Sequence, residues 1–508
     1  MISQFTSTWR PTIWWTSALL QRIQYAIALG CVVLVGTAAA GSSFAAEIRL
    51  PDMGASASNV FSPELDRRVG AAFMRQIRRN MNVIDDPEMR AYVRSMGLKL
   101  ASNSNNAGLR FNFFLVENPV INAFAGPGGN IAVNSGLVKI TDSESELASV
   151  FAHEISHVTQ RHLPRAFERQ AQLSTPTMAA MVGAIILAAV NPQAGQAALM
   201  GVQGASAQMQ IDFTRANEKE ADRVGVQLMQ RSGYDPHAVP GFFSKMADAS
   251  KYSRGNDIPE FLLTHPVTSS RISEAQSRVE KLPKSTYRDS LGYLHFAARV
   301  RATMGSKLPG KMIKDFKKKL ETGNYPDEAA HRYGYAYLLL SANQLSAAAE
   351  QNRWLLNYAA DYMPYRVLNI RLKLAKREFT AAITATTNSL ELFPQNNALI
   401  LLLAEALFLN NQPGRAGVVI DRFISNNIEI PGGYQLRARI AAANGRAIEA
   451  YQMEAEYHYW GGYLQQGIAA LREAARQDGL DFITLSKIEN RLRFFQSELA
   501  AENEIFGG

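Results

Sequence analysis

The amino-acid sequence predicts an α+β fold: a mainly helical first domain with a small antiparallel sheet, followed by an all-α solenoid. Strand-like runs lie between residues 111 and 134, and apolar residues on either side of them recur at helical spacing. The C-terminal part repeats with a period of 34 residues. A chain of 508 residues is too long for one core of about 100–200 residues. We therefore divide it into residues 1–45, 46–305 and 310–508.

Composition excludes several classes of site. The chain is 47% hydrophobic and 19% charged, as expected of a globular protein. Its single cysteine excludes intramolecular disulfides, cysteine-rich zinc ribbons and iron–sulfur clusters, so any metal must be held by histidine and carboxylate. The net charge of +8 is spread without basic blocks, which disfavours a nucleic-acid partner.

Residues 1–45 are typical of a signal peptide. Residues 25–40 are apolar, Arg10 and Arg22 precede them, and Ser43-Phe44-Ala45 is a small-x-small cleavage pattern. The run is shorter than the roughly 20 residues that a spanning helix needs. An uncleaved anchor and lipidation at Cys31 are the alternatives.

The domain at residues 46–305 alternates helical and strand-like patterns. We expect two helices between residues 63 and 100, then strands at residues 111–116 and 130–134, the second following a Gly-Pro-Gly-Gly turn. Helices are expected at residues 144–162 and 211–232. The apolar run at residues 178–190 is too short to cross a bilayer, which leaves a buried helix or hairpin over the site, or a contact at the membrane surface.

The strongest chemical signal is His153-Glu154-Ile155-Ser156-His157 on the expected helix 144–162. Residues four apart share one face of a helix, so both imidazoles can bind one zinc ion. Glu154 is offset by about 100°, which places its carboxylate near the open position of the metal. Its expected role is to activate a metal-bound water, and this motif is a known zinc-protease signature.

A catalytic zinc site usually has three protein ligands, so a third must come from elsewhere. Gln160 and Leu163 stand where the metzincin pattern has glycine and histidine, which excludes that arrangement. We expect Glu218 to be the third ligand, with Asp222 one turn further on to orient a ligating histidine. Glu220 is the alternative ligand, but it lies about 200° from Glu218 and lacks that partner.

Three other residues have open roles. His162 lies about 140° from His157 on a continuous helix, so we expect a surface or second-layer position. His265, in Thr264-His265-Pro266, is a possible fourth zinc ligand, a transition-state donor or a packed loop residue. Arg271 is expected either to stabilise the oxyanion or to pair with an acid of the fold.

These motifs resemble peptidase family M48. The resemblance rests on His153-x-x-x-His157, Glu218-x-x-Ala221-Asp222, the Asn122–Gly129 segment and Thr264-His265-Pro266. It implies a gluzincin-like zinc endopeptidase with one Zn²⁺ per chain. Together with the signal peptide and the repeats, it implies a periplasmic member of the family in Gram-negative bacteria that acts in quality control of outer-membrane proteins. The repeats depart from their consensus, so the partner is less well defined than the chemistry.

The domain at residues 310–508 carries a helical repeat. Alanine recurs every 34 residues, which is the tetratricopeptide period, and four such repeats can stack into a continuous core. The pattern is degenerate, and an irregular helical bundle is the alternative. Residues 451–460 are aromatic and serve either as a binding face or as core. The recurring alanines are Ala348, Ala382, Ala416 and Ala450.

The expected reaction is hydrolysis of unfolded or misassembled polypeptides, with Glu154 moving the proton. An extended substrate would add to a sheet edge. The repeats would bind substrates or the outer-membrane assembly machinery. The competing hypothesis is an assembly scaffold or chaperone with a quiescent zinc site, and an intramembrane peptidase ranks last. The expected edge residues are Asn130, Ile131, Ala132, Val133 and Asn134.

Overall fold

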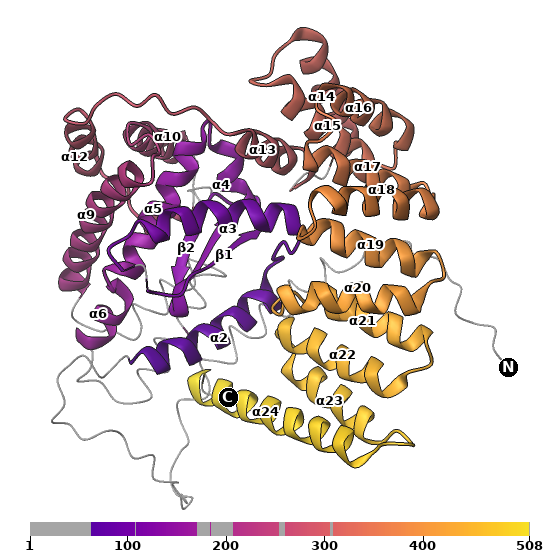
Figure 1. Cartoon of the computed structure of the whole chain (residues 1–508). Coiled ribbons are helices and arrows are strands. Elements are labelled where there is room, and N and C mark those ends of the chain that lie inside the picture. Colours follow the sequence, from indigo (N-terminus) through magenta and orange to yellow (C-terminus); the bar gives the residue numbers. More distant parts are fainter. Residues whose placement is uncertain are drawn as a thin grey trace, which may run out of the picture. The chain divides into compact units, whose positions relative to one another are not determined.

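The structure is a computed structural model that describes residues 62–106, 108–169, 183, 207–252, 260–304 and 308–506. The signal-peptide prediction lies outside the described residues, as does the apolar run 178–190 apart from Gly183. All described residues belong to one compact unit, Ala57–Gly508. They show helices around a small sheet, followed by a series of helices, which confirms the α+β fold class (Figure 1).

Two capped helices precede the sheet, as predicted. Helix α2 (Pro63–Asn80) begins with proline, and the Ser62 hydroxyl accepts a hydrogen bond from the Leu65 amide. Helix α3 (Pro87–Ser102) also begins with proline, and Asp86 accepts from the amides of its first turn. Both caps satisfy backbone donors that have no partner inside the helix.

The sheet has three strands, β1 (Asn112–Val116), β2 (Ala123–Gly126) and β3 (Asn130–Asn134), in the order β1-β3-β2. Strand β2 pairs antiparallel with β3 through a turn in which Gly128 and Gly129 have φ of 71° and 72°. Those positive φ values favour glycine. Strand β1 pairs parallel with β3, so the sheet is mixed and not wholly antiparallel.

The expectation that residues Asn130–Asn134 form an edge is wrong, because β3 lies between the other two strands. Its asparagines resemble the polar residues of a half-exposed strand, yet every residue of β3 is buried. The Asn130 amide donates to the carbonyls of Gly70 and Pro127 and accepts from Asn112. Within the described residues, β2 is the strand beside the candidate site that has an unpaired edge.

The helix predicted at residues 144–162 ends at Thr159, and His162 begins a second helix. Helix α5 (Glu144–Thr159) is capped by Ser143 and ends before Arg161, whose φ is 54°. Helix α6 (His162–Arg169) then starts in a new direction. Helix α4 (Ser135–Ile140) connects the sheet to α5.

Helices from later in the chain surround α5. Helix α9 (Ala207–Arg231) packs against α5 near Gly225, where an added Cβ would meet the Ala152 carbonyl carbon at an ordinary van der Waals distance of 3.4 Å. Figure 1 shows α9 beside α5, and α12 (Ser269–Val279) packs against α9. The other helices of this part are α10 (Ala238–Tyr252), α11 (Glu260–Thr264) and α13 (Leu291–Thr303).

The C-terminal helices recur as pairs. The second helices of four successive pairs begin at residues 345, 379, 413 and 447, a spacing of 34. A residue with positive φ stands before each of them, namely Asn343, Arg377, Asn411 and Gly445, again 34 apart. In each turn the next amide bonds back to a carbonyl five residues earlier, which closes the first helix. Ala348, Ala382 and Ala416 are fully buried, where small side chains let helices approach closely.

The helices of this series are α14 (Pro309–Thr322), α15 (Glu328–Ser341), α16 (Leu345–Tyr358), α17 (Met363–Ala375), α18 (Phe379–Leu392), α19 (Asn397–Leu409), α20 (Pro413–Asn426), α21 (Pro431–Ala443), α22 (Ala447–Trp460), α23 (Leu464–Ala475) and α24 (Phe482–Phe506). Tyr459 of α22 is buried and stacks on Phe495, so part of the aromatic segment belongs to the core. Arg75 of α2 pairs with Glu502 of α24 at 2.8 Å. Among the described residues, no helix is both long and apolar enough to cross a membrane.

Candidate active site

Helix α5 places His153 and His157 side by side. They are one turn apart, and their Nε2 atoms lie 3.1 Å from each other. Both rings leave the same face of the helix, as the i, i+4 spacing predicts. His153 is 5% exposed. Two imidazole nitrogens therefore point at one small volume inside the protein.

Helix α9 brings Glu218 to the same volume. Its Oε2 lies 3.3 Å from His153 Nε2, and its Oε1 lies 3.3 Å from His157 Nε2. Glu220 points elsewhere and contacts His162. The choice of Glu218 over Glu220 thus agrees with the position of each carboxylate.

His265 is also at this point. Its Nδ1 lies 3.0 Å from Glu218 Oε1 and 3.3 Å from His153 Nε2. One ligand atom from each of four residues lies within 4.8 Å of the others; they are His153, His157, Glu218 and His265. We call these four residues the histidine cluster. Among the described residues, this is the group of side chains that could hold a metal ion.

Glu154 lies beside the histidine cluster without belonging to it. The residue is 1% exposed, and its Oε1 atom is buried without a hydrogen-bond partner. The nearest imidazole nitrogen is His265 Nε2, at 3.5 Å. A carboxylate oxygen left in this state is costly unless a proton, a water or a ligand reaches it.

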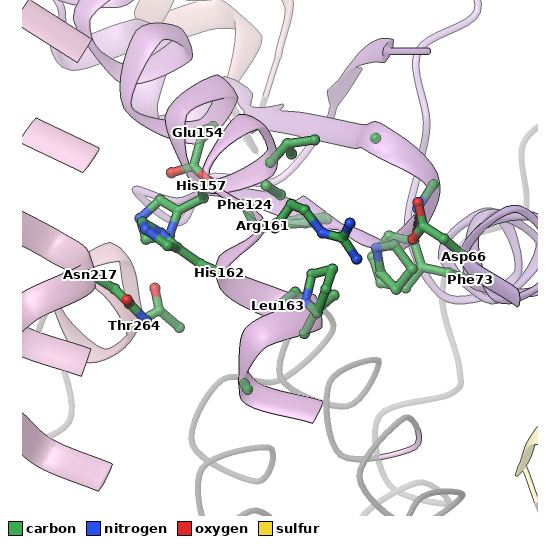
Figure 2. Close-up of a pocket in the computed structure, with 18 of the residues that line it drawn as sticks. Asp66, Phe73, Phe124, Glu154, His157, Arg161, His162, Leu163, Asn217 and Thr264 are labelled. Carbon is green, nitrogen blue, oxygen red and sulfur yellow. Dashed lines mark hydrogen bonds between the residues drawn. The ribbon is translucent and has the colours of Figure 1, made fainter. Parts of the chain in front are cut away.

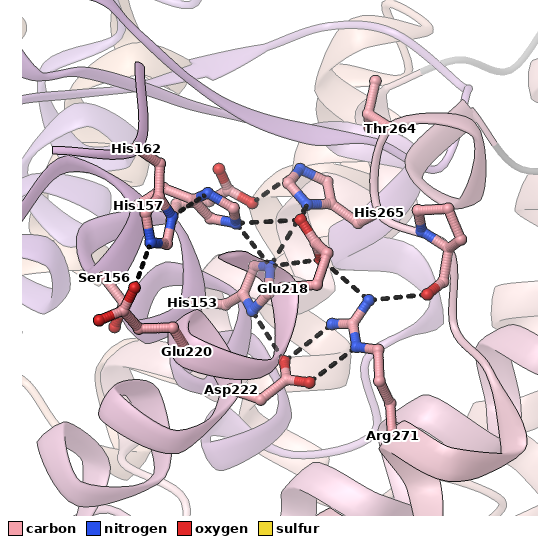
Figure 3. Close-up of polar contacts among 12 residues, drawn as sticks. His153, Ser156, His157, His162, Glu218, Glu220, Asp222, Thr264, His265 and Arg271 are labelled. Atoms are coloured by element: carbon pink, nitrogen blue, oxygen red, sulfur yellow. Dashed lines mark hydrogen bonds and ion pairs between the residues drawn. The ribbon is translucent and has the colours of Figure 1, made fainter. Parts of the chain in front are cut away.

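Asp222 and Arg271 form a second layer around His153 (Figure 3). Asp222 Oδ1 lies 3.0 Å from His153 Nδ1, and Arg271 makes a two-pronged pair with Asp222 at 2.7 and 2.8 Å. Arg271 also lies 2.9 Å from Glu218 Oε2 and donates to the Pro266 carbonyl. Of its two expected roles, the structure places Arg271 in the ion-pair role and not in the pocket.

His162 and Glu220 form a corresponding layer around His157. His162 Nδ1 lies 2.8 Å from His157 Nδ1, and His162 Nε2 lies 3.2 Å from Glu220 Oε2. Arg165 donates to the same oxygen at 2.8 Å. The sequence allowed either a surface or a second-layer position for His162, and the residue is buried in the second layer.

Burial and neighbouring charges shift the pKa values of the two α5 histidines in opposite directions. Burial alone would lower the pKa of His153, but Glu218 and Asp222 outweigh it and raise this pKa to about 10. Burial lowers the pKa of His157 to about 3. Burial would raise the pKa of Glu218, yet His265 and His153 hold it well below its usual value. The acids thus favour a positive charge where the ligand atoms meet, and a metal ion would replace the proton.

The donor set fits a zinc ion. Nitrogen and oxygen ligands of this kind suit Zn²⁺, and three of them plus one open position make a catalytic site. Glu218 and Asp222 pair with one guanidinium, Arg271, and the buried Glu154 adds a third carboxylate, so three negative charges and one positive charge leave −2 when the imidazoles are neutral. A divalent cation would cancel that charge.

A cavity of about 400 Å³ opens next to the cluster. Figure 2 shows Glu154 and His157 at one side of it and Phe73, Phe124 and Leu163 among its walls. Phe124, Ala125 and Gly126 of β2, an edge strand of the sheet, line the cavity. This strand, and not β3, is the sheet edge that an extended substrate could reach.

Comparison with known proteins agrees with this geometry. Residues 87–279 match Peptidase family M48. The Beta-barrel assembly-enhancing protease of Escherichia coli (strain K12) is 36% identical over 455 residues, which cover 87% of this chain and 90% of that protein. The chain belongs to peptidase family M48. It is therefore a zinc-metalloprotease hydrolase.

Two further relatives match different shares of this chain. The protein of the same name from Yersinia pestis is 35% identical over 468 residues, 91% of this chain and 96% of that protein. The Mitochondrial metalloendopeptidase OMA1 of Arabidopsis thaliana is 27% identical over 208 residues, 41% of this chain and 40% of its own length.

Proposed function

We propose that this protein is a zinc endopeptidase of the periplasm that cleaves unfolded or misassembled outer-membrane proteins. The observation that carries the proposal is the convergence of His153, His157 and Glu218 beside the buried Glu154, at a cavity bordered by a sheet edge. We propose the domain boundaries that the sequence predicts: a signal peptide at residues 1–45, a peptidase domain at residues 46–305 and a tetratricopeptide domain at residues 310–508.

His153, His157 and Glu218 would hold one zinc ion, with Asp222 orienting His153. When bound, the metal would lower the pKa of a coordinated water to about 7 and polarise the scissile carbonyl. Glu154 accepts the proton of the attacking water and passes it to the departing amine. Its burial suits this role, because a carboxylate oxygen without a hydrogen-bond partner, Oε1, is available to exchange a proton.

An extended polypeptide would bind by adding a strand to β2. Main-chain hydrogen bonds along Ala123–Gly126 depend little on side chains, which gives loose sequence preference. The names of the two enterobacterial relatives support outer-membrane protein assembly as the setting. The repeat helices would then bind substrates or the assembly machinery.

A second function, an assembly scaffold with a quiescent zinc site, is favoured by the position of His265. This residue lies 3.0 Å from Glu218 and 3.3 Å from His153, close enough to join the metal ligands. A fourth protein ligand would occupy the position that the attacking water needs. Protease and scaffold can coexist in one chain if His265 leaves the metal when substrate binds.

The test is Glu154→Gln, assayed with denatured casein and by zinc analysis of the purified chain. We expect one zinc per chain to be retained and hydrolysis to fall by about 10²–10⁴-fold, the range for loss of a general base. Glu274→Gln makes the same chemical change at an exposed residue of α12 and is expected to keep full activity. Unchanged turnover in Glu154→Gln would exclude Glu154 as the base.

The scaffold function has a separate test in cells. A scaffold acts without hydrolysis, so Glu154→Gln should still support assembly of outer-membrane proteins, whereas changes in the repeat helices should not. Loss of assembly with Glu154→Gln alone would show that cleavage is the only contribution.

A further inference from the structure

We propose that His162 and Glu220 are positioning residues that hold His157 in the tautomer able to bind the metal. The proposal rests on the zinc site proposed above. It concerns residues outside the histidine cluster, and it assigns a role to Glu220, the acid that is not a ligand.

The imidazole rings of His157 and His162 are in direct contact. His157 Nδ1 and His162 Nδ1 are 2.8 Å apart, so one of them donates a single proton to the other. The other nitrogen of His157, Nε2, faces the histidine cluster and lies 3.3 Å from Glu218 Oε1. A metal ligand needs a free lone pair, so the proton of neutral His157 must be on Nδ1.

The contacts of His162 give the direction of that hydrogen bond. Glu220 Oε2 lies 3.2 Å from His162 Nε2, and an ionised carboxylate can only accept, so His162 Nε2 carries a proton. The Nδ1 atoms of the two rings are 2.8 Å apart, so only one of them can carry a proton, and the need for a free lone pair on His157 Nε2 places that proton on His157. His162 Nδ1 is then an acceptor, and it accepts the Nδ1 proton of His157.

The backbone explains how His162 reaches this position. On a continuous helix it would lie about 140° from His157. Arg161 instead adopts φ of 54°, which ends α5 and starts α6 at His162. The same break directs Arg165 of α6 toward Glu220 of α9. The local break in the helix therefore builds the second layer of the site.

The two metal-binding histidines of α5 would thus be oriented in different ways. Asp222 contacts the Nδ1 atom of His153 directly, at 3.0 Å. At His157 the corresponding acid, Glu220, acts through an intervening imidazole. In both cases an acid outside the metal shell determines which ring nitrogen faces the ion.

The experiment measures zinc affinity of the full mature chain by competition with a chromophoric chelator. We expect His162→Phe to weaken zinc binding by about 10–100-fold, the usual cost of losing an outer-shell partner. His162→Gln keeps an acceptor within reach of His157 and should stay within a few-fold of wild type. The zinc affinity of Glu220→Ala should lie between those of His162→Phe and His162→Gln. His237→Phe, a half-buried histidine far along the chain from the site, is the matched control and should bind zinc normally.

Equal zinc affinity of folded His162→Phe and wild type would overturn the proposal, as would equal losses in His162→Phe and His162→Gln. If His162→Phe does not fold, the comparison of His162→Gln with Glu220→Ala decides, and equal affinity of both with wild type overturns the positioning role. Failure of wild type itself to bind zinc would instead refute the proposed function, so the two failures are distinguishable.

Discussion

Two buried groups of charged side chains behave differently in this protein. The first surrounds the histidine cluster, where there are three carboxylates and one guanidinium and Glu154 Oε1 has no hydrogen-bond partner. The second, which we call the paired cluster, joins Asp86 and Glu88 of the α3 N-terminus to Arg299 of α13 and Arg371 of α17.

The paired cluster is balanced. Arg299 lies 2.6 Å from Asp86 and 3.1 Å from Glu88, and Arg371 lies 2.7 Å from Asp86. Tyr337 donates to Glu88 at 3.0 Å. Two acids and two guanidiniums cancel, so the group needs no ligand and connects helices far apart in sequence. Unbalanced buried charge therefore marks the binding site, whereas balanced charge marks a structural contact; an unpartnered buried atom does not separate the two clusters, because Arg371 Nε of the paired cluster also lacks a hydrogen-bond partner.

Metal removal should have the largest effect, and it should affect the histidine cluster but not the paired cluster. A chelator should abolish casein hydrolysis, because the reaction needs the metal, and added zinc should restore it. Far-ultraviolet circular dichroism should change little, because the paired cluster contains no metal ligand. Hydrolysis that persists after zinc analysis shows an empty protein would contradict the assignment.

The next effect comes from breaking the paired cluster. Arg299→Met leaves Asp86 and Glu88 short of a cation in a buried place, which costs about 3–5 kcal/mol of unfolding free energy. Urea denaturation measures the loss, and zinc content per folded chain should stay unchanged. Arg472→Met, at an exposed position of α23, is the control and should cost less than about 0.5 kcal/mol.

A smaller effect concerns acid stability. Burial would raise the pKa of Asp86, but Arg371 and Arg299 outweigh it and hold this pKa well below its usual value. Because the folded pKa is depressed, the contribution of Asp86 is complete above its ordinary pKa of about 3.9 and is lost as pH falls below that value. Asp86→Asn should therefore flatten the fall in unfolding free energy below about pH 4.

This acid effect has a matched control. Asp315 of α14 pairs with Lys319 at an exposed site, so Asp315→Asn should leave the acid dependence as in wild type. Urea denaturation at pH 6 and at pH values below 4 measures both variants. An equal slope for Asp86→Asn and wild type would show that Asp86 does not carry the effect.

The smallest effect is expected at an exposed pair. Lys317 and Glu321 lie 3.8 Å apart on α14 with side chains 66% and 62% exposed. Lys317→Met should change the unfolding free energy by less than about 1 kcal/mol, because solvent screens such pairs. A loss similar to that of Arg299→Met would remove the distinction between buried and exposed pairing.

Local sequence patterns were sufficient to predict several features of the protein. The 34-residue period depends on the repeated geometry of short helix pairs, and the common face of His153 and His157 depends on one helical turn. The pairing of Glu218 with Asp222 also follows from i, i+4 spacing, which is why Glu218 could be preferred to Glu220.

Other parts could not be predicted because they depend on contacts between distant segments. The sequence did not reveal that β3 is the central strand, since strand order is decided by which edges meet in the folded sheet. The paired cluster joins residues more than 200 positions apart, and no local period marks such a contact.

The sequence alone therefore determined the fold class, the family and the chemical groups of the site, because these follow from composition, motif and helical spacing. Only the tertiary structure decided which edge strand lines the cavity, that the Arg161 break brings His162 against His157, and that Glu154 is buried with one oxygen, Oε1, lacking a hydrogen-bond partner. The physical reason is that burial and charge balance are properties of packed segments, and no segment has them before the others are in place.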